Sequence, residues 1–328
     1  MERVHIKNKR FKVVSLFAGI GGLDLGFDYA GFNIIWANDF DKWACQTYKA
    51  NVNENIVEGD ISQMKNMIPD HDVLIGGFPC QPFSTLGKLK GFEDEDRGNM
   101  FFEIMSIVKE HDTKVIVLEN VKNLITHDKG NTFAQIKKLL DEANYDVNYK
   151  VLNSQDYGVP QRRNRVFIVA FNRKYFKKGI FEYPEKEELT VTTQDLLDEN
   201  VEEKYFLTEK ISHTILGVGT KGYIVKPTID LPISKTLTAT MHKMHRASQD
   251  NYVTDEINFE RNVTDKNRRI NIRKLTPNEC RKLQGFPSDW KQVVADIHAY
   301  KEFGNAVTVN VSYKVACKVM EYMKINKK

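Results

Sequence analysis

The sequence predicts an α/β fold: a mixed, mainly parallel sheet with helices on both faces, and a smaller domain inserted before the last helix. Two observations predict the sheet. Short β-branched runs alternate with helical patterns through the first half of the chain, and these runs are almost continuously apolar, as in strands buried on both faces. A third observation predicts the insertion, because residues from about 185 to 275 are polar, rich in Thr and Asn, and lack this alternation.

The expected strands cover residues 11–16, 33–36, 55–57, 72–75, 114–118, 147–152 and 165–171. Helical patterns between them cover residues 22–30, 41–51, 99–110 and 132–143. A final helix is expected over residues 305–324, where valines recur every four positions. The first domain is therefore expected to span residues 1–185 and to be completed by 300–328, with a second domain over 186–275 and a hinge over 276–299.

The composition is that of an ordinary globular protein, with 41% hydrophobic and 28% charged residues. No apolar run is long enough to span a bilayer, and residues 1–12 do not resemble a secretory signal. The cysteines Cys45, Cys80, Cys280 and Cys317 lie far apart, without zinc or disulfide spacing, so a reduced, cytosolic chain without a metal is expected. The net charge of +4 does not by itself indicate nucleic acid. Basic residues predominate over 221–282, which indicates either a solvated surface or a nucleic-acid contact.

A glycine loop, FAGIGG at residues 17–22, follows the first expected strand and opens a helix. Glycines let the backbone approach a ligand near helix N-terminal amides, although a tight turn alone would also explain them. Asp39 ends the second strand, where an acidic side chain can hold ribose hydroxyls, and Asp60 with Ile61 follows the third. These strand ends predict a nucleoside pocket. The loop lacks the GxGxxG spacing and a Walker lysine, which disfavours dinucleotides and nucleoside triphosphates.

A cysteine between two prolines follows the fourth expected strand, in GGFPCQPFS at residues 76–84. The prolines hold Cys80 rigidly at the ligand-binding edge of the sheet. A thiolate is the strongest nucleophile among ordinary side chains. The alternative, a small buried apolar residue, is disfavoured by the polar, proline-bounded context. Cys80 is therefore predicted to be a nucleophile.

Charged residues at two further strands extend the expected site. Glu119 ends an apolar strand in VIVLENV, as either a structural cap or a group kept near neutrality for proton exchange. Arg163 and Arg165, in QRRNR, would point to one side if their strand began this early. They would then supply cations to a phosphate, a carboxylate or a thiolate; surface arginines at a strand entrance are the alternative.

The ordered set FAGIGG, GGFPCQPFS, ENV, QRRNR and GNAV resembles the cytosine-5 DNA methyltransferase family, especially the compact bacterial restriction–modification enzymes. The similarity covers about residues 11–171 and 273–311. It implies a Rossmann-like fold dependent on S-adenosylmethionine, in which Cys80 adds to C6 of a cytosine flipped out of duplex DNA and C5 accepts the methyl group. It also implies that Glu119 contacts N3 and the exocyclic amine, that Arg165 holds O2, and that Arg163 orders the catalytic loop and site.

The resemblance further implies a pocket for S-adenosyl-L-methionine, with S-adenosyl-L-homocysteine as the product. In this pocket Asp39 matches the ribose-binding acid, and Phe40 stands where a tryptophan that flanks adenine is more usual. The full set of implied cofactor residues is Phe17, Gly19, Ile20, Gly22, Asp39, Phe40, Asp60, Ile61, Pro79, Asn305 and Val307.

Two segments are expected to meet DNA. Residues 84–98 are rich in glycine, lack periodicity, and are expected to close as a lid. The resemblance makes 186–275 the target-recognition domain, with a Thr-Leu step at 236–237, although an ordinary polar loop would look similar. The expected DNA contacts are Gln81, Ser84, Leu86, Lys88, Arg97, Thr238, His242, Lys243, His245, Arg246, Gln249 and Asn251. Phosphate contacts are expected from Arg268, Arg269, Arg273 and Lys274.

The expected setting is the bacterial cytoplasm, where a monomer acts on double-stranded DNA and is functionally paired with a restriction endonuclease. A tRNA cytosine-5 methyltransferase shares the same core, but that branch typically carries a Cys-Phe-Thr element in its recognition region. No cysteine lies between Cys80 and Cys280. A non-catalytic DNA binder would be expected to have lost Cys80 or Glu119. A thiol hydrolase would need a histidine partner, for which His71 and His127 are the candidates.

Overall fold

The computed structural model describes residues 2, 6, 8–79, 100–220, 223–224 and 226–328. Its residues cluster into two compact units. The sheet unit comprises described residues within Arg3–Asn153, Asn164–Glu185 and Val311–Lys328, and the insert unit comprises those within Met1–Glu2, Ser154–Arg163 and Lys186–Asn310. The predicted domain bounds differ from this division at residues 154–163 and 300–310, which group with the insert unit.

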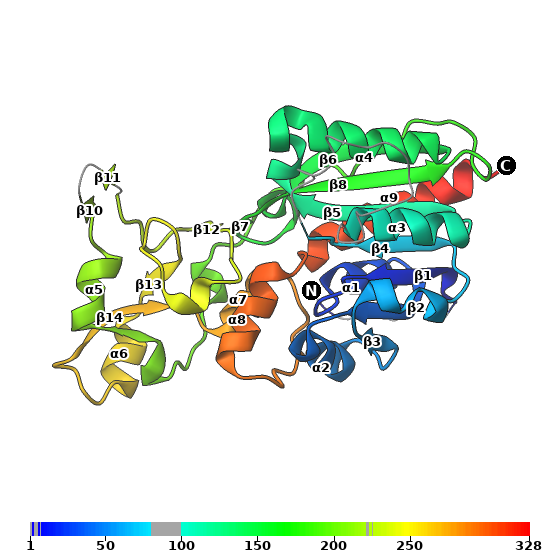
Figure 1. The fold of residues 1–328 in the computed structure, drawn as a ribbon. Helices are drawn as coiled ribbons and strands as arrows, with labels where there is room; N and C mark the ends of the chain where they lie inside the picture. The colour runs from blue at the N-terminus through cyan, green and yellow to red at the C-terminus, as the bar shows by residue number, and fades with distance from the viewer. Residues whose placement is uncertain (1, 3–5, 7, 80–99, 221–222, 225) are drawn as a thin grey trace. The chain divides into compact units, whose positions relative to one another are not determined.

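The sheet unit is built on a seven-stranded sheet of order β3-β2-β1-β4-β5-β8-β6 (Figure 1). Pairings among the first five strands of this order are parallel, whereas β8 is antiparallel to both of its neighbours. The predicted mixed, mainly parallel sheet is therefore confirmed. Its strands are β1 (Arg10–Leu16), β2 (Phe32–Asp39), β3 (Ile56–Glu58), β4 (Val73–Gly76), β5 (Val115–Val121), β6 (Tyr145–Asn153) and β8 (Asn164–Asn172).

Helices cover both faces of this sheet. They are α1 (Gly22–Tyr29), α2 (Lys42–Asn51), α3 (Met100–Glu110), α4 (Asn131–Glu142) and α9 (Val309–Ile325). Val14 of β1 belongs to a buried cluster with apolar residues of α3 and α4. Its neighbour Ser15 points to the opposite face, where its hydroxyl donates to Asp24 of α1. On that face α1 and α9 approach closely, since a Cβ on Gly26 would lie 2.2 Å from Ser312 Oγ.

The expected final helix begins later than predicted. Helix α8 (Asp296–Asn305) ends before Ala306, whose φ of −57° and ψ of 149° are extended, and α9 begins at Val309. The carbonyl oxygens of Gly304 and Ala306 accept hydrogen bonds from the Arg163 guanidinium, at 3.1 and 2.7 Å. These carbonyls therefore bond to a side chain from a distant segment, and the helix expected over 305–324 is present as α9, with a start four residues later than predicted.

The insert unit contains short elements without βαβ order. Its three-stranded antiparallel sheet has the order β13-β14-β9, and Leu207, Ile215, Ala247 and Tyr252 form a buried cluster. Two shorter pairings join β7 to β12 in parallel and β10 to β11 antiparallel. The strands are β7 (Gln161–Arg162), β9 (Phe206–Thr208), β10 (Gly219–Thr220), β11 (Tyr223–Ile224), β12 (Ser234–Lys235), β13 (Tyr252–Thr254) and β14 (Arg269–Lys274). The helices are α5 (Glu209–Ile215), α6 (Glu256–Asn262), α7 (Pro277–Leu283) and α8.

None of the helices in the described part of the chain combines the length and apolar character needed to cross a bilayer.

Candidate functional site

The glycine loop lies at the carboxyl end of β1, and three of its residues take left-handed backbone angles, among them Gly21 with φ of 85°. Phe17 has φ of 54° and Gly19 has φ of 56°. A bulky residue rarely adopts this conformation, and such strain concentrates at functional sites. The loop is held to β2 because the Ala18 N–H donates to the Asn38 carbonyl at 2.9 Å. Apart from its chain neighbours, no atom of the described residues lies within 4 Å of the position that a Gly19 Cβ would take, so these residues leave the space over the loop open.

Asp39 fastens this loop to the end of β2. Its Oδ2 accepts from the Gly19 N–H at 2.7 Å, and its Oδ1 accepts from the Asp41 N–H at 2.8 Å. Burial raises the pKa of Asp39 despite these hydrogen bonds, which lower it. The next side chain, Phe40, is 74% exposed. A carboxylate, an open glycine loop and an exposed ring at one strand end are the groups that ribose hydroxyls and a base would contact. The residues present therefore fit a nucleoside cofactor.

The other expected cofactor residues of the sheet unit differ in exposure. Asp60 is exposed, and its Oδ1 accepts from the Ser62 N–H at 2.9 Å. Ile20 and Ile61 are each 2% exposed, so they would present mainly backbone groups to a ligand. Gly22 is the first residue of α1. Asn305 and Val307 belong to the insert unit, and their approach to the cofactor stays a prediction.

Glu119 and Arg165 form an ion pair between adjacent strands. Glu119 is 7% exposed at the end of β5, and its Oε1 lies 3.0 Å from Arg165 Nε on β8. Burial lowers the pKa of Arg165, and the Glu119 charge opposes this shift. Arg165 Nη1 also donates to the Asn164 carbonyl at 2.9 Å. The arginine therefore fixes the orientation of the carboxylate.

The chain that leads to Cys80 passes beside this ion pair. A Cβ on Gly77 would lie 3.4 Å from Glu119 Oε2. Asn120 Nδ2 donates to the Phe78 carbonyl at 2.8 Å, which ties the segment to the end of β5. The exposed Pro79 is the last described residue before a gap. The expected site residues Cys80, Gln81, Ser84, Leu86, Lys88 and Arg97 lie outside the described residues.

Among the described residues, the hydrogen bonds of Arg163 go to other groups than those of Arg165. Strand β8 begins at Asn164, so the condition for the two arginines to project from one strand is not met. Arg163 is 1% exposed, and besides the carbonyls at the break before α9 it donates to the Leu237 carbonyl at 3.0 Å. It thus holds backbone within the insert unit. The ordering role expected of Arg163 stays a prediction, as does any contact with a substrate.

The side chains of the insert unit that are expected to contact DNA differ in their exposure and in their hydrogen bonds within the fold. Thr238, Lys243 and Gln249 are exposed, and Arg246 is partly buried. Rings of His242 and His245 are hydrogen-bonded locally, to the Ala239 carbonyl at 3.2 Å and to Thr240 Oγ1 at 3.0 Å. The Asn251 amide bonds to both the N–H and the carbonyl of Lys235, at 2.8 and 3.1 Å. We therefore assign Asn251 to the structure of the loop.

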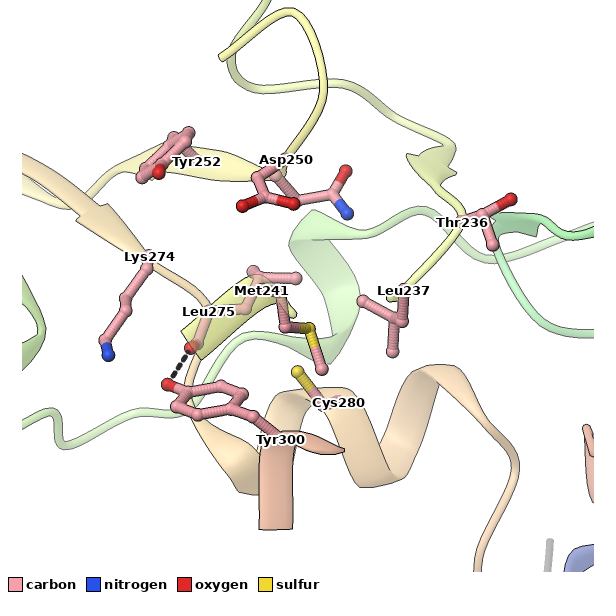
Figure 2. Close-up of a pocket in the computed structure, with 10 residues that line it drawn as sticks. Thr236, Leu237, Met241, Asp250, Tyr252, Lys274, Leu275, Cys280 and Tyr300 are labelled. Carbon is pink, nitrogen blue, oxygen red and sulfur yellow. Dashed lines mark hydrogen bonds between the residues drawn. The ribbon is translucent and has the colours of Figure 1, made fainter. Parts of the chain in front are cut away.

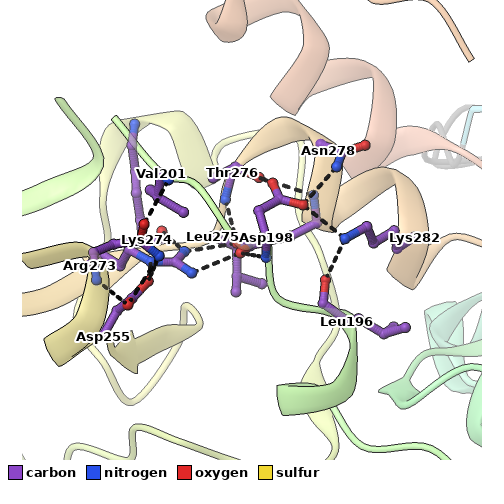
Figure 3. Close-up of polar contacts among 12 residues, drawn as sticks. Leu196, Asp198, Val201, Asp255, Arg273, Lys274, Leu275, Thr276, Asn278 and Lys282 are labelled. Carbon is purple, nitrogen blue, oxygen red and sulfur yellow. Dashed lines mark hydrogen bonds and ion pairs between the residues drawn. The ribbon is translucent and has the colours of Figure 1, made fainter. Parts of the chain in front are cut away.

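The phosphate-binding expectation was wrong for Arg273. This side chain is fully buried, with Nε 2.6 Å from Asp255 Oδ2 and Nη2 2.8 Å from Glu279 Oε1. Figure 3 shows Arg273 beside Asp255 in this network. Arg269 is also paired, at 3.0 Å from Glu203. Arg268 is paired more loosely, with Nε 3.5 Å from Asp265 Oδ2, and its side chain is 84% exposed. The sequence shows a basic residue but not the partner that folding gives it.

The two candidate histidine partners for a thiol hydrolase, His71 and His127, are both hydrogen-bonded within the fold. The His71 ring nitrogens lie 2.9 Å from the Pro69 carbonyl and 2.9 Å from Thr113 Oγ1. Burial is the largest cause of the lowered pKa of His71. His127 Nδ1 lies 2.7 Å from Thr132 Oγ1. These contacts favour a structural role for both residues.

A small pocket that the sequence did not reveal lies within the insert unit. It is lined by both ends of the loop between β12 and β13 and by α7 and α8 (Figure 2). Leu237 and Met241 enter from the loop, while Cys280 and Tyr300 enter from the helices. The Tyr300 hydroxyl donates to the Leu275 carbonyl at 2.6 Å. Burial raises the pKa of Cys280 well above its usual value, so this thiol is a packing residue.

Known proteins resemble this chain along nearly its whole length. Residues 11–321 match the family model described as C-5 cytosine-specific DNA methylase. The Type II methyltransferase M.HhaI of Haemophilus parahaemolyticus is 36% identical over 95% of this chain and 96% of its own length. M.Bsp6I of Bacillus sp. is 38% identical over 95% of this chain and 99% of its own. The solved structure of S. pombe Dnmt2 methyltransferase superposes with a TM-score of 0.72, covering 95% of this chain and 99% of that one. Its 21% identity shows a shared fold.

Proposed function

Since the chain belongs to the C-5 cytosine-specific DNA methylase family, we propose that it methylates C5 of a cytosine in a short, specific site of double-stranded DNA. Its relatives are Type II methyltransferases, which supports a role as the modification enzyme of a restriction–modification system. The observation that carries this proposal is the Glu119–Arg165 ion pair beside the chain that leads to Cys80. A tRNA substrate is the less supported alternative.

In the proposed reaction the Cys80 thiolate forms a bond to C6 of the cytosine, and the ring electrons move toward C5. Glu119 contacts N3 and the exocyclic amine, and Arg165 contacts O2, so both stabilise the ring as its charge changes. After C5 has gained the methyl group, it loses its proton to a base and the electrons of that bond expel Cys80. The short Arg165–Glu119 distance supports these roles, because a fixed carboxylate meets the ring in one orientation.

When bound, S-adenosyl-L-methionine would supply the methyl group that C5 takes up, with S-adenosyl-L-homocysteine as the product. Asp39 would hold the ribose hydroxyls, and the exposed Phe40 ring would cover the adenine. The open space over Gly19 would let the loop backbone approach the methionine end.

Base contacts are proposed for residues 238–249, where Thr238, Lys243 and Gln249 are exposed. The lid expected over residues 84–98 lies outside the described residues. Moving the base out of the stack costs a few kcal/mol. A monomer that works in the bacterial cytoplasm beside a cognate endonuclease is part of the same proposal.

The test incubates the protein with S-adenosylmethionine and duplex DNA that carries 5-fluorocytosine in place of cytosine. Fluorine cannot leave C5 as a proton does, so a covalent adduct that maps to Cys80 is expected after denaturing electrophoresis. Cys80→Ser is the matched control and should give no adduct. An adduct only with fluorinated tRNA would move the substrate to RNA, and no adduct with either would contradict the covalent mechanism.

A further inference from the structure

We infer that Lys235 sets the discrimination between target sequences without touching DNA, by holding the base of the loop formed by residues 236–250, here called the reading loop. This inference rests on the proposed function, because the reading loop includes most of the side chains proposed to contact bases.

The Lys235 ammonium group joins separate stretches of backbone. Its Nζ donates to the carbonyl oxygens of Thr228, Ala247 and Asp250, at 3.1, 2.7 and 3.1 Å. An ammonium group has three donors, and each is directed to a carbonyl here. Burial lowers the pKa of Lys235, and the Asp250 charge opposes this shift. The N–H and Oγ1 of Thr228 also donate to the Ala247 carbonyl, at 3.2 and 3.3 Å, so Lys235 reinforces the attachment of the end of the reading loop to the segment that precedes β12 and extends it to Asp250.

The backbone of Lys235 closes the loop at its two ends. Asn251, which follows the last residue of the loop, accepts from the Lys235 N–H and donates to the Lys235 carbonyl. Lys235 also pairs with Arg162 in the β12–β7 ladder, so the closure is joined to a strand outside the loop. The Leu237 N–H donates to Gln161 Oε1 at 3.1 Å, which extends this attachment into the loop.

The return half of the reading loop is fixed by the same closure. Asp250 is 7% exposed, and its Oδ2 accepts from the His245 N–H at 2.8 Å. The Tyr252 hydroxyl donates to the His245 carbonyl at 2.7 Å, and the Ala247 N–H donates to the Ile215 carbonyl at 2.9 Å. Because Lys235 bonds to both Ala247 and Asp250, its removal would leave Ala247 held, within the described part of the chain, by Thr228 and Ile215 alone and would loosen the backbone that carries Lys243 and Gln249.

Base reading is more sensitive to such a release than phosphate binding. Hydrogen bonds to base edges require donors at defined positions, whereas phosphate contacts carry no sequence information. A loop that occupies several positions would therefore still bind DNA but would distinguish the target poorly from near relatives. A general loss of folded protein would act differently, since it lowers the rates at all sites by the same factor.

The experiment compares wild type with Lys235→Met, which keeps the length of the side chain and removes its donors. Lys210→Met is the matched control, because Lys210 is an exposed lysine of α5 in the same unit. A pool of duplexes with randomised base pairs around one cytosine is methylated briefly and read by bisulfite sequencing. The measured quantity is the ratio of initial rates at the preferred site and at its single-base variants.

We expect this ratio to fall about tenfold in Lys235→Met and to stay at the wild-type value in Lys210→Met. An unchanged ratio in Lys235→Met would overturn the inference, even if every rate were lower. If Lys235→Met methylates no site, the ratio is measured in Lys235→Gln, whose amide retains two donors. A lower ratio there supports the inference, and a wild-type ratio overturns it. Wild-type protein that methylates no cytosine would instead contradict the proposed function.

Discussion

Replacing Arg273 by methionine should reduce stability and leave DNA binding intact. The guanidinium is fully buried. Its Nε bonds to Asp255, and its Nη2 and Nη1 bond to the two carboxylate oxygens of Glu279, the latter at 2.9 Å. Its removal leaves the carboxylates of Asp255 and Glu279 without their cationic partner, and the Glu279 side chain is only 1% exposed. Removing one partner of a buried ion pair costs about 3–5 kcal/mol. Glu279 still accepts hydrogen bonds from the N–H groups of Thr276 and Asp198. We therefore expect the free energy of unfolding to fall by the lower end of this range, about 3 kcal/mol.

The assay is urea unfolding followed by tryptophan fluorescence, with Arg268→Met as the control. Because the Arg268 side chain is exposed, its replacement should change the free energy of unfolding by less than about 0.5 kcal/mol. DNA affinity as a function of salt then separates the two roles. Arg268→Met should reduce the slope of log affinity against log salt by about one, whereas Arg273→Met should not change it. If both variants lost the same stability, or if Arg273→Met reduced the salt dependence of DNA affinity, the structural role given to Arg273 would be refuted.

Four further outcomes are expected. Cys80→Ser should nearly abolish methyl transfer and keep cofactor binding close to wild type, as measured by calorimetry; retained turnover would rule out the covalent route. Glu119→Gln should slow single-turnover chemistry more than it weakens DNA binding, and equal losses would indicate a structural role. Burial raises the pKa of Asp24 from 3.8 to about 6, so the folded state binds this proton more tightly than the unfolded chain. The resulting stabilisation is complete below pH 3.8 and is lost as the pH rises through about 6. The free energy of unfolding of Asp24→Asn, measured against pH, should therefore lack this loss of about 3 kcal/mol. An unchanged pH dependence would show that burial does not raise the pKa of Asp24. Exchange of residues 241–252 for those of a relative should change the methylated sequence seen by bisulfite sequencing; unchanged specificity would place recognition elsewhere.

The strands and the cofactor edge could be predicted from the sequence because their signals are local. Continuous apolar runs mark buried strands, and carboxyl ends of parallel strands meet at one edge. Asp39 and Gly19 were therefore expected to lie close together, and a hydrogen bond joins them. Glu119 was expected at a strand end and lies there, although its partner was not foreseen. The pairing with Arg165 depends on β8 running antiparallel beside β5, which no local pattern specifies.

What the sequence did not reveal depends on contacts between distant segments. The break before α9 coincides with bonds from Arg163, which lies about 140 residues earlier in the chain. In the sequence Arg273 looks like any other basic residue, because its partners Asp255 and Glu279 meet it only in the folded chain. The same holds for Lys235, whose three carbonyl partners show no sequence signature because every residue has a carbonyl group.

The partners of Arg163 have a consequence for how such a protein can change during evolution. Arg163 comes from a short stretch that precedes β8, and its acceptors Leu237, Gly304 and Ala306 all lie within residues 186–310. A gene that gained a foreign copy of that long stretch by recombination would keep its own Arg163. The acceptors are main-chain carbonyls, which the donor sequence supplies whatever its side chains are. An inherited Arg163 can thus hold any exchanged stretch that keeps this backbone path, so an exchange of the region proposed for recognition would need no compensating change at Arg163.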